Sequence, residues 1–96
     1  MSPRAIELVT TNPATGQELA RYATHDDAAV EAALDAAAGA ARLWATTSME
    51  ERGALLRSVQ AMLTERREEY AALITAEMGK PLAEARGEID KCAWNC

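Results

Sequence analysis

The sequence has no phenylalanine and only two tryptophans and two tyrosines, so large side chains for a core are scarce. Leucine, isoleucine and valine together number 15, whereas 22 of the 47 apolar residues are alanine, which buries little surface. Self-sufficient globular domains usually draw at least roughly 20% of their residues from the large aliphatic and phenylalanine types. We therefore expect one small domain whose thin core needs a partner surface.

The chain also lacks the features of several protein classes. No apolar run approaches the roughly 18 residues of a transmembrane helix, and the N-terminus has no signal-peptide pattern. The formal net charge is −5 and no basic cluster is present, unlike a nucleic-acid-binding protein. Two cysteines in a helical pattern do not make a disulfide framework. The sequence predicts a cytoplasmic protein with no membrane segment and no nucleic-acid partner.

Motifs for catalysis, cofactors and metals are missing as well. There is no G-x-G-x-x-G or Walker-type loop, and the one histidine, His25, is interpreted as a solvated residue at a helix entry. Cys92 and Cys96 lack further metal ligands and the redox C-x-x-C spacing, so we interpret them as buried, inert thiols. Lys80 is interpreted as a structural corner residue, the alternative being an anion site beside a helix start. Spacing alone predicts no catalytic, cofactor-binding or metal-ligating residue.

The first 23 residues have the pattern of a β-hairpin. "AIELVTT" (5–11) and "QELARYA" (17–23) flank "NPATG", in which Asn12 and Pro13 suit the first two positions of a type I turn. Gly16 can take the positive φ that returns the chain. A bulged or looped hairpin over 5–23 is predicted, and an isolated two-stranded ribbon is only marginally stable.

An alanine-rich helix is predicted over 26–45, with Thr24 as its N-cap. One face at helical spacing carries mostly small residues, which allow close approach of another element. The members of this face are Val30, Ala33, Leu34, Ala37, Ala41 and Trp44.

A second helix is predicted over 49–78, opened by a capping box of Ser48 and Glu51. The polar run "TERREEY" indicates a possible break near 64–68. The acidic side chains of this region are interpreted as solvated residues that pair with arginines four positions away. They are Glu50, Glu51, Glu65, Glu68 and Glu69.

The last predicted helix runs over 81–96. Gly79 is placed to end the preceding helix in a left-handed conformation, and Pro81 to occupy the first helical position. Trp94 lies well off the apolar stripe of this helix, which therefore has two surfaces to bury. The stripe comprises Leu82, Ala85, Ile89, Cys92, Ala93 and Cys96.

The order of these pieces resembles the N-terminal part of the NAD(P)-dependent aldehyde dehydrogenases. The matching features are "NPATGQ" after a strand, Trp44 closing an alanine-rich helix, "S-x-x-E-R" at 48–52 and "EMGKP" at 77–81. The resemblance covers about residues 9–96. The closing "EIDKCAWNC" is most similar to the succinate-semialdehyde dehydrogenase branch.

This resemblance implies an α/β parent fold with a Rossmann-like cofactor domain, a catalytic domain and an oligomerisation arm. Residues 1–96 would form the N-terminal part of the cofactor-binding domain, a hairpin followed by three to four helices and mostly α. The implied enzyme is an oxidoreductase and a homo-oligomer. It oxidises an aldehyde, by the branch succinate semialdehyde, through a cysteine thiohemiacetal, with hydride transfer to NAD or NADP and a glutamate base.

The implied cysteine and glutamate would lie beyond Cys96, so no catalytic or cofactor-binding residue is carried onto this chain. By itself the chain would then bind no cofactor and turn over no aldehyde. Because helix 81–96 has two faces to cover, we expect the chain to be truncated within it, its partner being the remainder of the same enzyme or a homologous subunit. The alternatives are a small helical module that docks on a full-length homologue, or a helical scaffold unrelated to the enzyme.

Overall fold

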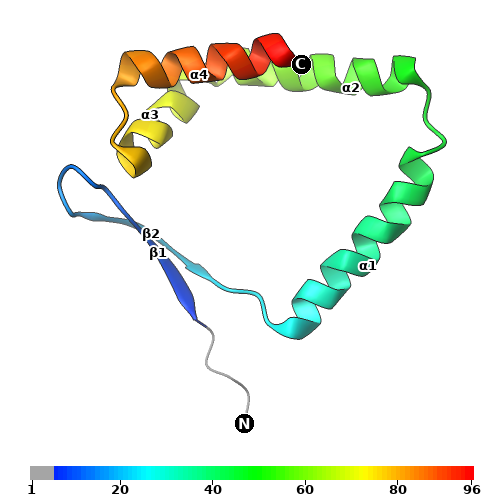
Figure 1. Ribbon diagram of the computed structural model, residues 1–96, viewed down its shortest axis with the longest axis horizontal. Coiled ribbons are helices and arrows are strands. Elements are labelled where there is room, and N and C mark those ends of the chain that lie inside the picture. The colour runs from blue at the N-terminus through cyan, green and yellow to red at the C-terminus, as the bar shows by residue number, and fades with distance from the viewer. Residues whose placement is uncertain (1–5) are drawn as a thin grey trace.

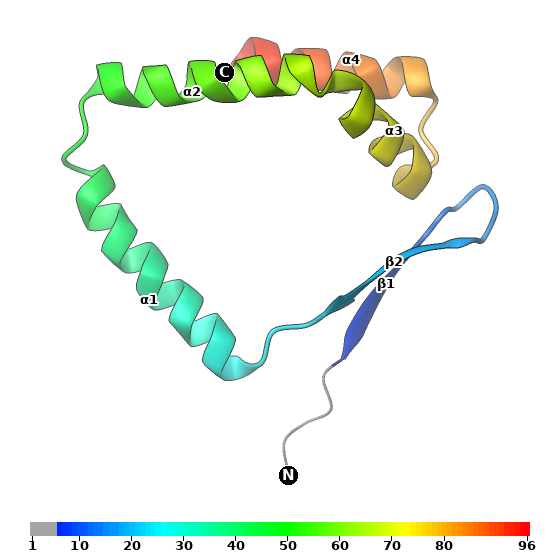
Figure 2. The same cartoon turned by 180° about the vertical axis from the view of Figure 1, so that it is seen from behind.

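A computed structural model describes residues 6–96 as a two-stranded hairpin followed by four helices (Figure 1). The order is β1 (Glu7–Thr11), β2 (Glu18–Ala23), α1 (Asp27–Trp44), α2 (Met49–Glu65), α3 (Arg67–Met78) and α4 (Leu82–Asn95). The elements lie around the edge of a flat frame measuring 48 × 48 × 14 Å, as the front and back views show (Figures 1 and 2). The predicted hairpin and mostly helical fold are thus confirmed, and the described residues form four helices where three to four were expected.

The hairpin is antiparallel, with Leu8 opposite Tyr22 and a register irregularity between Thr10 and Thr11. Its loop is ordered by Asn12, whose side-chain Oδ1 accepts the backbone N–H groups of residues 14 and 15 at 2.9 and 3.3 Å. Gly16 has a φ of 74°, as the turn requires, and donates its N–H to the Asn12 carbonyl at 2.8 Å. The predicted bulged hairpin is confirmed except at residue 5, which lies outside the described residues.

Helix α1 begins one residue later than predicted, and its N-cap is Asp26, not Thr24. The Asp26 carboxylate accepts the backbone N–H of Ala29 at 2.8 Å. Thr24 lies too far ahead of the helix to cap it, because its N–H still continues the hairpin ladder, donating to the Ile6 carbonyl at 2.9 Å, and the helix begins three residues later.

Helices α2 and α3 are one predicted helix divided at Arg66. The capping box is present: the Glu51 N–H donates to Ser48 Oγ at 3.1 Å, and the Ser48 N–H donates to Glu51 Oε2 at 3.0 Å. Arg66 has φ −98° and ψ 18°, outside the helical region, so the chain turns there. The predicted interruption near 64–68 is therefore confirmed.

The corner between α3 and α4 is formed by Gly79 and Pro81. Gly79 ends α3 with φ 73° and ψ 12°, as predicted. Pro81 is the N-cap of α4, not its first helical residue, because its ψ of 139° is extended while its carbonyl already accepts the Ala85 N–H at 3.0 Å. The hairpin loop reaches this corner: a Cβ built on Gly79 would lie 3.1 Å from Pro13 Cγ.

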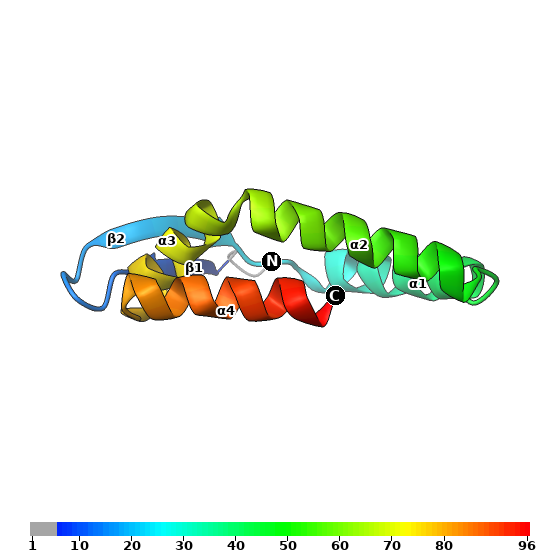
Figure 3. The same cartoon turned by 90° about the horizontal axis from the view of Figure 1, so that it is seen from above.

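The core is small and lies where α4 packs against α2 and α3. Helix α4 runs antiparallel to α2 alongside it (Figure 3). Among the described residues the buried apolar side chains are Ala71, Ala85, Ile89 and Ala93. This confirms the thin core predicted from the alanine-rich composition.

The fold is far more open than a compact domain of its size. Its radius of gyration is 18.0 Å, whereas a compact chain of this length has about 12 to 13 Å. The accessible surface is 7805 Å², against about 5,400 Å² for a compact monomer of this mass. The frame therefore exposes about 2,400 Å² more than a closed domain would.

Candidate functional site

The junction of α1 and α2 is held by Arg52. Its Nε donates to Thr47 Oγ1 at 2.9 Å and its Nη2 to the Trp44 carbonyl at 2.8 Å. The same guanidinium carbon lies 5.2 Å from the centroid of the Trp44 ring, a cation–π distance. Arg52 thus adds a charged donor to the Trp44 carbonyl at the end of α1, which also accepts the Thr47 N–H at 3.0 Å, and it fixes the Trp44 side chain. Composition and spacing alone did not point to this role.

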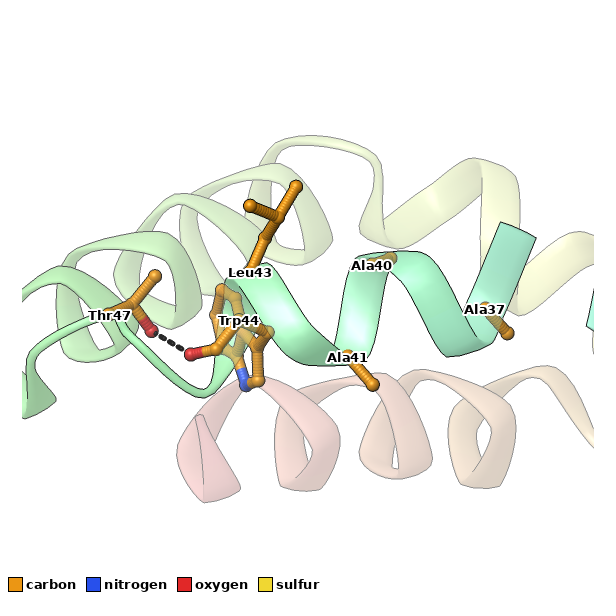
Figure 4. A pocket seen from close by; sticks show the side chains of 6 residues that line it. All are labelled: Ala37, Ala40, Ala41, Leu43, Trp44 and Thr47. Atoms are coloured by element: carbon orange, nitrogen blue, oxygen red, sulfur yellow. Dashed lines mark hydrogen bonds between the residues drawn. The ribbon is translucent and has the colours of Figure 1, made fainter. Parts of the chain in front are cut away.

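Beside this junction is a shallow concavity of about 560 Å³. Three alanines of α1 line it together with the larger side chains that close the helix (Figure 4). Its lining residues are Ala37, Ala40, Ala41, Leu43, Trp44 and Thr47. The Thr47 hydroxyl donates to the Trp44 carbonyl at 2.7 Å, so the polar groups here serve the helix end. Without a titratable lining side chain, the concavity can receive apolar surface but offers no group for proton transfer or nucleophilic attack.

The predicted apolar faces of α1 and α2 continue this exposed surface. Neither helix contains a buried residue. Helical spacing places several large apolar side chains on one side of each helix, where a closed domain would bury them. Here they are about half exposed. They include Val30, Leu34, Leu55, Leu56, Val59 and Met62. Such extended apolar surface marks an interaction region.

Ion pairs connect α3 to α4 outside the core. Arg67 binds Asp90 with two bonds, Nε–Oδ1 at 2.7 Å and Nη2–Oδ2 at 2.8 Å, and Arg86 Nη2 binds Glu68 Oε2 at 2.9 Å. Hydrogen bonding from Arg86 holds the pKa of Glu68 below its ordinary value, and hydrogen bonding from Arg67 does the same to the pKa of Asp90. The prediction that Glu68 pairs along its own helix is therefore wrong, because its principal partner comes from α4.

Lys80, at the α3–α4 corner, is paired with Glu88 of α4. Hydrogen bonding to that carboxylate raises the pKa of Lys80. The ammonium group is therefore engaged within the chain, which favours the structural corner over the anion site.

The two cysteines are not where the sequence placed them. Cys92 is exposed and Cys96 half-buried, and both are free thiols, so the prediction of two buried thiols is wrong. The core face of α4 is formed by Ala85, Ile89 and Ala93, and in the described structure α2 and α3 cover that face without reaching Cys92.

Other candidate sites remain dispersed. His25 is exposed, as predicted, in the link between β2 and α1, across the frame from the C-terminal end of α4 (Figure 1). Among residues 6–96, no three or more His, Cys, Asp or Glu side chains gather as a metal site. None of the helices described is sufficiently long and apolar to cross a membrane.

Comparison with known proteins identifies the family. The model of the aldehyde dehydrogenase family matches residues 2–96. The chain is 42% identical over 94 residues to succinate semialdehyde dehydrogenase [NAD(P)+] of Escherichia coli, a match covering 96% of this chain and 20% of that enzyme. It is 39% identical over 89 residues to the probable succinate-semialdehyde dehydrogenase [NADP(+)] of Synechocystis, covering 93% of this chain and 20% of the relative.

A third relative is named for a different substrate. It is the 3-sulfolactaldehyde dehydrogenase of Pseudomonas putida, 48% identical over 79 residues, covering 82% of this chain and 16% of that enzyme. The chain thus spans about a fifth or less of the length of these relatives. Because the family match extends over nearly all of its residues, the protein belongs to the aldehyde dehydrogenase family.

Proposed function

We propose that residues 1–96 form the N-terminal part of the cofactor-binding domain of an NAD(P)-dependent aldehyde dehydrogenase. The observation that carries this proposal is the exposed apolar surface of α1 and α2, on a frame with about 2,400 Å² more accessible surface than a compact monomer. Obligate protein interfaces commonly bury about 2,000 Å² or more in total. The frame is therefore of the kind that a larger domain covers.

The occupant of this surface is the remainder of the same enzyme or a homologous subunit, in a homo-oligomeric enzyme. Trp94 supports a second contact region, because it is 81% exposed on the side of α4 away from the core. We place the enzyme in the cytoplasm, since its cysteines are free thiols and form no disulfide framework.

The substrate proposed is an aldehyde that carries an anionic group, with succinate semialdehyde as the first choice. Five of the named relatives are succinate-semialdehyde dehydrogenases, including that of Paenarthrobacter nicotinovorans, which is 51% identical over 67 residues. Others are named for 3-sulfolactaldehyde and glutarate semialdehyde. These aldehydes share an acidic group at the far end of a short chain. The proposal is therefore that the substrate carries an acidic group, and the length of its carbon chain is secondary.

The residues of this chain do not themselves fit a dinucleotide. A phosphate-binding turn needs glycines between a strand and the helix it opens. The two glycines with positive φ, Gly16 and Gly79, lie in the hairpin loop and at the α3–α4 corner, and Pro13 occupies the space beside Gly79. NAD or NADP would therefore be bound by other residues of the enzyme, as would the aldehyde at its cysteine and glutamate.

The test is to express the reading frame that contains this chain through to its stop codon and to assay the product. Reduction of NAD and NADP is followed with succinate semialdehyde, 3-sulfolactaldehyde and glutarate semialdehyde. The highest kcat/KM is expected for succinate semialdehyde, and none of the three reacting would contradict the proposed enzyme. Residues 1–96 purified alone are expected to give no reduction with any of them.

The alternative is a small helical module that docks on a full-length homologue. It is favoured by the completeness of local signals, such as the Ser48–Glu51 capping box and the Gly79 terminus, which form helices without a larger domain. Two results together would favour this module. One is a stop codon directly after the codon for residue 96, and the other is co-elution of the chain with a family enzyme in size-exclusion chromatography.

A further inference from the structure

Two thiols lie at the end of α4, four residues apart: Cys92 is in the helix and Cys96 directly follows it as the C-cap. The thiol of Cys96 donates to the Cys92 carbonyl, with Sγ 3.3 Å from the oxygen, so its sulfur is directed back toward the turn that carries Cys92. Ile89 and Ala93 are buried against the neighbouring helices and fix the rotation of α4. The Cys92 side chain is exposed, and Cys96 is half-buried. Two free thiols thus lie within one helical turn of each other, with at least that of Cys92 accessible to small ions.

The number of ligands restricts which metal ion this pair can hold. A structural zinc ion takes four ligands, whereas within residues 6–96 no three potential His, Cys, Asp or Glu ligands come together. Soft thiolate ligands select Cu(I) among biological cations, and Cu(I), with a filled d shell, accepts two sulfur ligands in a linear arrangement. The donor set present here therefore matches Cu(I).

We propose that Cys92 and Cys96 together chelate one Cu(I) ion. Residues four apart on a helix have Cβ atoms about 5–6 Å apart, and Cys96, one residue beyond the helix, keeps its thiol over the Cys92 carbonyl. Two metal–sulfur bonds of about 2.3 Å, the length of a zinc–thiolate bond, would place the sulfur atoms at most about 4.6 Å apart. The thiols need only rotate toward each other, with no change in the helix. Binding converts two thiols and Cu(I) into a bis-thiolate complex and releases two protons, with no change in oxidation state.

The experiment titrates purified residues 1–96, kept reduced, with Cu(I). The chromogenic chelator bathocuproine disulfonate competes with the protein for the ion. One Cu(I) is expected per chain, and loading is expected to leave the elution volume in size-exclusion chromatography unchanged. Cys92→Ser and Cys96→Ser each remove one ligand and are expected to weaken binding by about 100-fold or more, because the second sulfur no longer acts at high effective concentration.

A spacing control keeps two thiols but separates them. In the double variant Cys96→Ser with Trp94→Cys, the thiols at 92 and 94 are two residues apart and point to different sides of the helix, so binding is expected to fall to the level of the single-thiol variants. Far-UV circular dichroism confirms that each variant keeps its helix. Equal affinity of the spacing control, one Cu(I) per two chains, or no competition by the unaltered chain would each overturn the proposal.

Discussion

The guanidinium of Arg52 lies over the indole of Trp44, 5.2 Å from the ring centroid, while its Nη2 donates to the carbonyl of the same residue at 2.8 Å. One side chain of α2 thereby holds both the carbonyl and the ring of Trp44, the last residue of α1. Helix α1 has no buried residue of its own. The angle between α1 and α2 therefore depends on this contact more than on a core.

Replacing Arg52 with alanine is expected to loosen the α1–α2 junction by about 1 to 2 kcal/mol, since two largely exposed charged hydrogen bonds and a partly exposed cation–π contact are lost together. Arg52→Lys keeps the charge but not the forked donors, so it is expected to recover only part of the stability. Urea unfolding followed by Trp44 fluorescence in a Trp94→Phe background measures the change. Arg57→Ala, which removes an exposed arginine of the same helix, is the control; equal midpoints for the two alanine variants would contradict the role of Arg52.

Gly79→Ala is expected to destabilise the fold by about 1 to 2 kcal/mol, because alanine is strained at a φ of 73° and its methyl group would press on Pro13 at 3.1 Å. Adding Pro13→Ala is expected to recover the steric part and leave the backbone strain. Thermal unfolding by circular dichroism measures both variants.

Two other glycines separate these effects. Gly16 has a φ of 74° and open space around it, so Gly16→Ala reports backbone strain alone. Gly87 lies within α4 with nothing nearby, and Gly87→Ala is expected to stabilise the helix by about 0.5 to 1 kcal/mol. If Gly79→Ala costs no more than Gly16→Ala, the contact between the hairpin loop and the corner is unimportant.

Ala85→Leu is expected to destabilise the fold by about 1 to 3 kcal/mol, because Ala85 is fully buried where α4 meets its neighbours and has no room for three more carbon atoms. Ala83→Leu makes the same chemical change at an exposed position of the same helix and is expected to be nearly neutral. The difference between their urea midpoints measures the closeness of packing. Equal midpoints would show that α4 does not pack as closely as the structure has it.

Acid is expected to weaken the attachment of α4 to α3. Pairing with Arg86 and Arg67 lowers the folded-state pKa values of Glu68 and Asp90, so these carboxyl groups take up protons more readily in the unfolded chain. Their contribution is therefore complete above the ordinary carboxyl pKa of about 4 and is lost as the pH falls through the lowered folded values. Carboxyl NMR titration of the folded chain measures these values directly.

The matched variants are Arg86→Gln and Arg57→Gln. Arg86→Gln is expected to raise the pKa of Glu68 toward its ordinary value and to reduce the loss of helical signal on acidification, whereas Arg57→Gln leaves both unchanged. An unchanged Glu68 titration in Arg86→Gln would mean that the ion pair does not form in solution.

The sequence by itself determined the local elements of this protein, because their signals lie within a few residues of each other. The positive φ of Gly16, the Ser48–Glu51 box, the interruption at 64–68 and the Gly79 terminus all occur as predicted. Where prediction failed locally, at Thr24 and Pro81, the error was two residues or fewer, and a neighbouring hydrogen bond explains it. The scarcity of large side chains likewise predicted the thin core.

Only the tertiary structure decided which residues meet across the chain. Helical periodicity put Cys92 on the core face, yet α2 and α3 cover a face centred on Ile89 and leave that thiol exposed. The same docking brought Arg86 to Glu68 and Arg67 to Asp90, and the position of the hairpin brought Pro13 to Gly79. A helical repeat specifies which residues share a side of one helix. The rotation of that helix against its neighbours depends on side chains that are distant in the sequence. Those distant contacts also determine the open arrangement of the elements.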